Sequence, residues 1–149
     1  MNMIQKAKEQ VQELTKQAYA AAVKENLLPD GVSIAPSVEI PKDVSNGDYT
    51  TTFCLAAAKA MKMNPRQVAS VLMQHMTLED SYFTSVELAG PGFMNFRLGD
   101  KWYGDTVAAI EAAGGDYGCS DMLKGRKIMV EFVSANPTGP MHMGNARGG

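Results

Sequence analysis

Residues 82–98 read Tyr-Phe-Thr-Ser-Val-Glu-Leu-Ala-Gly-Pro-Gly-Phe-Met-Asn-Phe-Arg-Leu, and this stretch predicts a β-hairpin. Two short runs rich in aromatic and branched residues, 82–88 and 93–98, flank the tetrapeptide Ala-Gly-Pro-Gly. Glycines on both sides of a proline supply the positive φ angles that tight connections between strands need. Because the strands of a hairpin pair antiparallel, the chain is expected to contain a sheet with antiparallel strands.

The two faces of the second hairpin strand differ in chemistry, because successive side chains point to opposite sides of a sheet. One face is wholly apolar and is predicted to contact the core: Met94, Phe96 and Leu98. The other face is predicted to meet water or a partner: Phe93, Asn95 and Arg97. An exposed aromatic beside an amide and a cation can stack a base, read its edge and touch phosphate. An ordinary solvated face remains the alternative, since alternating strands also produce such trios by chance.

The rest of the first 115 residues predicts helices around this hairpin. Apolar residues recur at steps of three and four in the first segment, Asp48 is a plausible N-cap, and Asn64-Pro65 restarts a helix. The expected helices span residues 3–26, 49–63, 65–75 and 100–113, and a further strand is expected over 32–40. The predicted fold class is therefore α+β (mixed α/β), a small antiparallel-containing sheet packed by about four helices.

Composition narrows the classes of protein that the chain can belong to. The net charge of −2 over 149 residues gives no strongly basic domain of the kind that nucleic-acid binding usually shows. Cys54 and Cys119 are far apart and form no CxxC pair, which predicts two free thiols in a reducing cytoplasm and no disulfide framework or zinc site. No apolar run approaches the roughly 18 residues of a membrane span, so no membrane partner is expected.

The last part of the chain carries a different signal. An apolar run, Ile-Met-Val-Glu-Phe-Val at 128–133, is predicted to be a buried strand, and a Pro/Gly-rich turn follows it. The tetrapeptide at 142–145, His-Met-Gly-Asn, stands where class I nucleotide-activating enzymes place His-x-Gly-His at a helix N-terminus. Such a terminus offers unpaired N–H groups to phosphate, and glycine admits a close approach. Asn145 can donate a hydrogen bond but cannot carry positive charge.

A domain boundary is expected between these two signals. The predicted division is an N-terminal domain over 1–115, a linker over 116–126, and the truncated start of a Rossmann domain over 127–149. Since one strand cannot build a Rossmann site, the chain as given is expected not to perform catalysis alone.

The stretch over 130–148 resembles the signature segment of bacterial arginyl-tRNA synthetases, which are class I aminoacyl-tRNA synthetases. Four upstream segments resemble the N-terminal extension of that family: Ile40-Pro41-Lys42, Gly47-Asp48-Tyr49, Asn64-Pro65 and 89–96. The segments follow one another in the order of the family and span nearly the whole chain.

This resemblance implies a function and assigns roles to residues. The full-length enzyme would be a cytoplasmic, monomeric arginine–tRNA ligase that joins L-arginine to tRNA with ATP, Mg2+ coming from solution and no metal site in the protein. Its N-terminal domain would dock on the tRNA elbow at the D-loop through Phe93 and Asn95, with Arg97 beside them. The resemblance places further residues at the arginine and ATP sites. The arginine-binding residues would be Glu131, Ser134 and Asn136. The ATP-binding residues would be His142, Gly144 and Asn145, and of these His142 and Asn145 would be catalytic.

Two other interpretations stay open from the residues alone. One is a different HxGH-type nucleotidyltransferase that activates a small carboxylate without tRNA. The other is a non-catalytic interaction module whose exposed terminal strand pairs with another chain.

Overall fold

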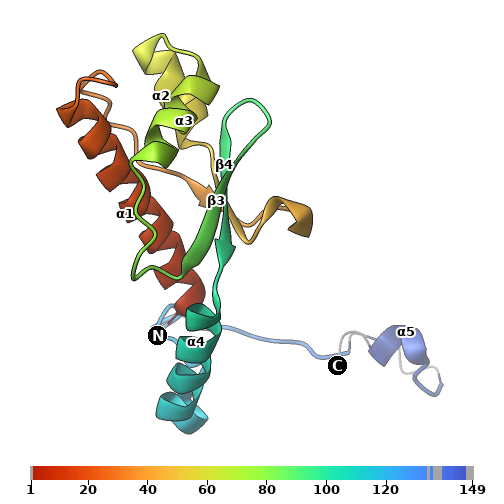
Figure 1. Ribbon diagram of the computed structural model, residues 1–149. Coiled ribbons are helices and arrows are strands. Elements are labelled where there is room, and N and C mark those ends of the chain that lie inside the picture. The colour runs from red at the N-terminus through yellow and green to blue at the C-terminus, as the bar shows by residue number, and fades with distance from the viewer. Residues whose placement is uncertain (1, 134, 136–138, 147–149) are drawn as a thin grey trace. The chain divides into compact units, whose positions relative to one another are not determined.

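The computed structural model describes residues 2–133, 135 and 139–146 (Figure 1). The chain divides into two compact units, Met1–Tyr117 and Gly118–Gly149. The helices of the first unit are α1 (Met3–Lys24), α2 (Phe53–Met61), α3 (Pro65–Gln74) and α4 (Asp100–Ala113), with 3-10 turns η1 (Val44–Asn46) and η2 (Gly114–Asp116). Its strands are β1 (Val38–Glu39), β2 (Tyr49–Thr51), β3 (Phe83–Ala89) and β4 (Phe93–Leu98).

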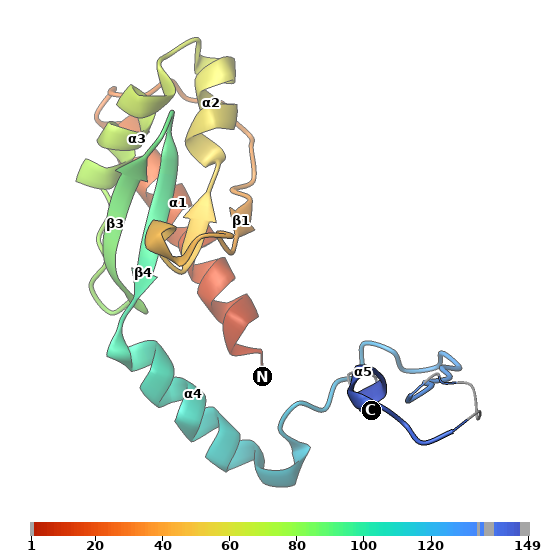
Figure 2. The same ribbon diagram turned by 90° about the vertical axis from the view of Figure 1, so that its right-hand side faces the viewer.

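The four strands form one sheet in the order β1-β2-β4-β3, and every neighbouring pair is antiparallel. The β3–β4 hairpin has the predicted place and turn, with Ala89 opposite Phe93. Helices α1, α2 and α3 contact the sheet through β1, β4 and β3 respectively, and they gather on one side of it (Figure 2). The predicted α+β fold class is therefore confirmed.

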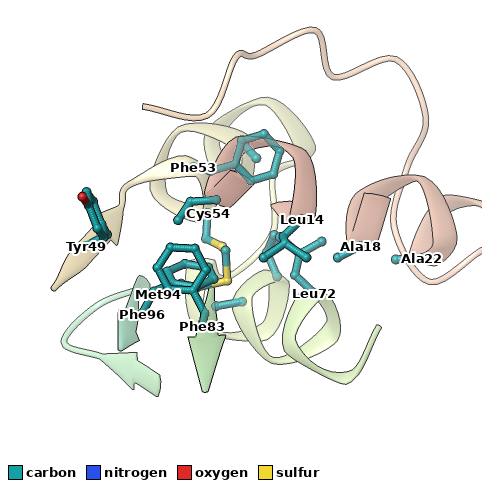
Figure 3. Close-up of a cluster of buried hydrophobic side chains, with 14 of the residues drawn as sticks. Leu14, Ala18, Ala22, Tyr49, Phe53, Cys54, Leu72, Phe83, Met94 and Phe96 are labelled. Carbon is teal, nitrogen blue, oxygen red and sulfur yellow. The ribbon is translucent and has the colours of Figure 1, made fainter. Parts of the chain in front are cut away.

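The core lies between α1, the α2–α3 pair and the sheet (Figure 3). Met94 and Phe96 are fully buried, as the strand alternation predicted, and the rings of Phe83 and Phe96 meet edge to face at 5.4 Å. On α1 the buried stripe is rich in alanine, including Ala7, Ala18 and Ala22. Small side chains let this helix lie close to its neighbours, and each buried aromatic stabilises the fold by roughly 1.5–3 kcal/mol.

The predicted helix over 49–63 was wrong at its start. Residues 49–51 form the central strand β2, and the helix begins only at Phe53. Tyr and Thr favour strands, and pairing with β4 makes residues 49–51 a strand rather than a helical turn. Asp48 is not a helix N-cap, because its carboxylate accepts the Leu98 N–H at 2.8 Å and its own N–H donates to the Phe96 carbonyl at 2.8 Å.

Other boundaries follow the local chemistry of the sequence. Asn64 caps α3 by accepting the Arg66 N–H at 2.9 Å, and Pro65 occupies the first turn. Helix α4 ends at Ala113 and is followed by the C-cap Gly114, which has a φ of 53°. The strand predicted over 32–40 was too long: only Val38–Glu39 forms a strand, because the residues before it make no ladder.

The second unit does not contain the predicted strand. Residues 128–133 have no regular structure, and Ile128, Val130 and Phe132 are exposed. A buried strand of a nucleotide-binding sheet is stabilised by neighbouring strands, and the described residues of this unit supply none. A single helical turn, α5 (Met143–Ala146), follows His142. The assignment of 127–149 to a catalytic domain, and of 116–126 to a linker, stays a prediction.

The structure also bears on membrane-spanning helices and on the state of the two cysteines. Within the described ranges, no helix has the length and apolar character needed to cross a membrane. Both cysteines are free thiols, Cys54 buried and Cys119 exposed.

Candidate nucleic-acid interface

A pocket of about 310 Å³ lies on the outer face of the sheet, beside the hairpin turn. We call it the hairpin pocket, and it is lined by Pro41, Asn46, Thr50, Ala89, Gly90, Phe93 and Asn95. Phe93 and Asn95 alternate along β4 with the buried Met94, so they point away from the core. Thr50 of β2 stands directly opposite Asn95 in the strand register. Two adjacent central strands thus supply the floor.

The loop before β2 forms one wall of the pocket. Its backbone lies directly on β4 at Gly47, which has a φ of 87° and where a Cβ would stand 2.8 Å from the Phe96 carbonyl oxygen. The 3-10 turn η1 is capped by Asp43, whose carboxylate accepts the Ser45 N–H at 2.9 Å. Hydrogen bonds from the backbone and side chain of Ser45 lower the pKa of Asp43. This turn places Asn46 at the rim.

The hairpin turn forms the opposite wall, and α3 supports it. At Gly92 a Cβ would stand 2.8 Å from the Cβ of Pro65, so only glycine permits this packing of the turn on the start of α3. The Arg66 guanidinium donates a hydrogen bond to the Gly90 carbonyl. A Cβ at Gly90 would lie 3.6 Å from the Phe93 ring, so the ring stands beside an open glycine. The turn therefore holds Phe93 at the pocket without covering it.

The three residues predicted to form a binding face do not stay together. Phe93 is half-buried and lines the pocket, whereas Asn95 is only 7% exposed and lies at its floor, deeper than the alternation of β4 alone predicted. Arg97 is not among the lining residues. Its guanidinium donates to the Ser45 carbonyl at 2.8 Å and lies 3.8 Å from the Glu87 carboxylate. Arg97 thus ties the loop wall to β4.

The floor of the pocket carries polar groups without partners. The Thr50 Oγ1 atom is buried and makes no hydrogen bond to any part of the chain that the structure describes. The Asn95 side-chain amide likewise has no hydrogen-bond partner among residues 2–133, 135 and 139–146. Buried polar groups are nearly always hydrogen-bonded, so the buried, unpartnered Thr50 hydroxyl beside the Asn95 amide marks a place for a polar ligand. Sequence reasoning missed Thr50 because it placed residues 49–51 in a helix.

The other predicted site residues lie in the second unit. Glu131 is exposed, and Ser134 and Asn136 fall outside the described residues. His142 and Gly144 are exposed, and the His142 Nδ1 atom accepts the Gly144 N–H at 3.1 Å. Asn145 belongs to the single turn α5. The described residues of this unit form no sheet beneath these positions, so the assignment of these residues to the arginine and ATP sites stays a prediction.

The described residues also bear on metal and thiol chemistry. In those residues, no group of three or more His, Cys, Asp or Glu side chains is arranged to hold a metal ion. Burial raises the pKa of the Cys54 thiol to about 12, so this thiol stays protonated and is a poor nucleophile.

Comparison with known proteins assigns the first unit to a family. A sequence model of the family described as "Arginyl tRNA synthetase N terminal domain" matches residues 3–98, which include α1, α2, α3 and the whole sheet. The chain belongs to this family. The resemblance to arginyl-tRNA synthetases, drawn from short motifs, is thereby confirmed.

Individual relatives of this arginyl-tRNA synthetase N-terminal domain give the same result. Arginine–tRNA ligase of Acetivibrio thermocellus is 44% identical over 99% of the chain, and that of Caldanaerobacter subterraneus subsp. tengcongensis is 45% identical over 99%. The chain spans 26% of the length of each of these relatives. The arginyl-tRNA synthetase of Plasmodium falciparum shares the fold, with a TM-score of 0.53 and 10% identity over 67% of this chain and 17% of that one.

Proposed function

We propose that this chain is the tRNA-recognising N-terminal part of an arginine–tRNA ligase, and that the hairpin pocket takes one base of the tRNA D-loop at the elbow. The family match covers the pocket in full, since its lining residues fall between 41 and 95. The observation that carries the proposal is the pairing of an accessible aromatic ring, Phe93, with unpartnered polar groups on Thr50 and Asn95.

The chemistry of the pocket suits a single unstacked base. Single-stranded loops are recognised by stacking bases on aromatic rings and by hydrogen bonds to base edges. Phe93 supplies the ring, and the Asn95 amide can both donate and accept. A volume of about 310 Å³ is at the small end of ligand sites, which favours one base over a larger group. Thr50 can turn its hydroxyl toward a ligand by a change of χ1.

Charged side chains contribute little to the affinity of the hairpin pocket for nucleic acid. Arg97, the nearest cation on the same strand face, is engaged by Ser45 and Glu87. Because phosphate neutralisation supplies most non-specific affinity for nucleic acids, a pocket with no free cation selects a base more than it adds affinity.

We further propose that the whole protein joins L-arginine to tRNA with ATP and with Mg2+ from solution, as a cytoplasmic monomer. In the whole protein, arginine is contacted by Glu131, Ser134 and Asn136. ATP is contacted by His142, Gly144 and Asn145. The names of the curated relatives and the matching motifs support this extension. They also favour it over a nucleotidyltransferase that works without tRNA.

Equilibrium binding of an arginine-specific tRNA transcript tests the pocket. We expect Phe93→Ala to weaken binding by roughly 1–3 kcal/mol, which is about fivefold to 150-fold, because a stacked base loses its platform. Tyr103→Ala is the matched control, since Tyr103 is an aromatic residue of α4 that is 52% exposed and lies outside the pocket. Equal affinities for the two variants would contradict the assignment of the pocket to a base.

A further inference from the structure

The corner formed by α2 and α3 belongs to the longest stretch of the chain without an acidic residue, and this stretch carries three cations. Residues 49–78 contain Lys59, Lys62 and Arg66 and no Asp or Glu, in a chain whose net charge is −2. Lys59 lies in α2, Lys62 caps its C-terminus, and Arg66 lies in the first turn of α3. We call these three residues the cationic corner, and all three are exposed.

The cationic corner is not neutralised by neighbouring carboxylates. None of its members forms an ion pair with a residue that the structure describes, whereas Lys101 and Lys124 each lie within 4 Å of an aspartate, at 3.2 Å and 3.9 Å. The Asp30 carboxylate lines a hollow with Met63, next to Lys62, but it accepts the Gly31 N–H at 2.7 Å. The corner therefore presents positive charge that is available to a partner.

One member of the cationic corner, Arg66, contacts the turn that lines the hairpin pocket. Arg66 donates to the Gly90 carbonyl, and Gly90 lines the pocket. The hairpin turn and the α2–α3 pair stand at the same end of the first unit (Figures 1 and 2). A shallow hollow of about 460 Å³ runs along α3 from this junction. Its lining residues are Met63, Arg66, Gln67, Ser70, Val71 and Gln74.

Four of the six side chains that line this hollow can donate hydrogen bonds: Arg66, Gln67, Ser70 and Gln74. Guanidinium, amide and hydroxyl groups all donate to phosphate oxygens, and no carboxylate lines the hollow. A base held in the hairpin pocket would bring its own backbone within reach of this end of α3. Continuity with a pocket suited to a base favours a polynucleotide over an acidic protein surface.

We propose that the cationic corner binds phosphates of the RNA strand that flanks the base held in the hairpin pocket. This inference rests on the proposed function and deepens it: the pocket selects a base, and the corner supplies the electrostatic affinity that the pocket lacks. Arg66 connects the corner to the pocket, since its guanidinium supports the hairpin turn and borders the α3 hollow.

The test is the salt dependence of binding to an arginine-specific tRNA transcript. The variant Lys59→Gln/Lys62→Gln removes two charges and leaves Arg66 in place to support the turn. The matched control is Lys16→Gln/Lys24→Gln, which removes two exposed charges from α1. The logarithm of the binding constant falls linearly with the logarithm of the salt concentration, and each phosphate contact on a single strand contributes about 0.7 to the steepness of this fall. We therefore expect the slope of the corner variant to be shallower by about 1.4.

At about 150 mM salt the same loss weakens binding on the order of tenfold, and the control leaves slope and affinity near the wild-type values. Equal slope changes in both variants would show a general charge effect and overturn the proposal. So would displacement of the tRNA by polyglutamate at equal charge concentration, which would indicate an acidic protein partner. Thermal unfolding of both variants checks that the fold is intact.

The same assay separates this inference from the proposed function. Phe93→Ala is expected to lower affinity without changing the salt slope, because stacking releases no counterions. Loss of affinity in Phe93→Ala with an unchanged slope in the corner variant would overturn the corner and keep the pocket. A reduced slope in the corner variant with no effect of Phe93→Ala would keep the corner as an RNA site and contradict the pocket. Absence of saturable binding would contradict both.

Discussion

Replacing Gly47 with alanine tests how the loop wall of the hairpin pocket is held on β4. Gly47 has a φ of 87° and a ψ of −168°, a region that only glycine visits readily, and forcing another residue into it costs roughly 1–3 kcal/mol. The new Cβ would also stand 2.8 Å from the Phe96 carbonyl oxygen, and relieving such overpacking costs about 1–3 kcal/mol more. We expect the free energy of unfolding to fall by roughly 3 kcal/mol.

Gly31→Ala separates the two contributions. Gly31 has a φ of 90°, but a Cβ there would meet no atom within 4 Å. This control therefore carries the backbone cost alone, about 1–2 kcal/mol. Urea unfolding followed by circular dichroism measures both variants against the wild type. The difference between them, about 1–2 kcal/mol, is the contribution of the close approach to β4.

The same two variants connect the loop to binding. Displacing the loop moves Asn46 away from the pocket and breaks the bond from Arg97 to the Ser45 carbonyl. Gly47→Ala is therefore expected to weaken tRNA binding under conditions where it is still folded, and Gly31→Ala is not. Equal losses of stability in the two variants would refute the reasoning, because the clash with Phe96 would then contribute nothing.

Three further changes have expected outcomes. Thr50→Val removes a buried unpartnered hydroxyl and keeps the branched shape of the side chain. The free energy of unfolding in urea should rise by about 1 kcal/mol, and tRNA binding by the same protein sample should weaken. Asp48→Ala should lower the free energy of unfolding by about 1–2 kcal/mol in urea titrations, because a β4 N–H loses its acceptor, and Asp48→Asn should restore most of it. The Val71 carbonyl and then Glu25 raise the pKa of His75 above 6.5, so its stabilisation is present below that pH and is lost as the pH rises through the folded-state pKa. His75→Gln should therefore lower Tm more near pH 5.5 than near pH 8.

Local chemistry in the sequence predicted several elements of the fold well. Asn64-Pro65 predicted the start of α3 because an amide cap and an N1 proline act within one turn. The Gly-Pro-Gly turn predicted the hairpin in the same way. The strand β2 escaped prediction because three residues carry too little periodicity, and only pairing with β4 makes them a strand.

The candidate site was predictable in part. Alternation along β4 predicted that Phe93 and Asn95 leave the core together, which the structure agrees with. It could not predict the loop that buries Asn95 to 7% exposure or diverts Arg97, because that loop contacts β4 from about 50 residues away in sequence. The short pattern Asn46-Gly47 before Tyr49 was the available signal for Thr50, since a turn followed by strand-forming residues indicates a paired strand.

The apolar run at 128–133 shows the opposite kind of failure. Its composition predicted a buried strand, but burial depends on the neighbours that a strand has, and the described residues offer it none. Motif and composition identified the family there, whereas secondary structure depends on partners outside the motif.

A double-mutant cycle between the protein and the tRNA tests the central claim most directly. Abasic nucleotides are placed one at a time through the D-loop, and equilibrium binding is measured for the wild type and for Phe93→Ala. If the hairpin pocket holds one D-loop base, a single abasic position weakens wild-type binding and has no further effect on Phe93→Ala, giving a coupling energy of about 1–3 kcal/mol. Additive losses at every D-loop position would contradict the claim.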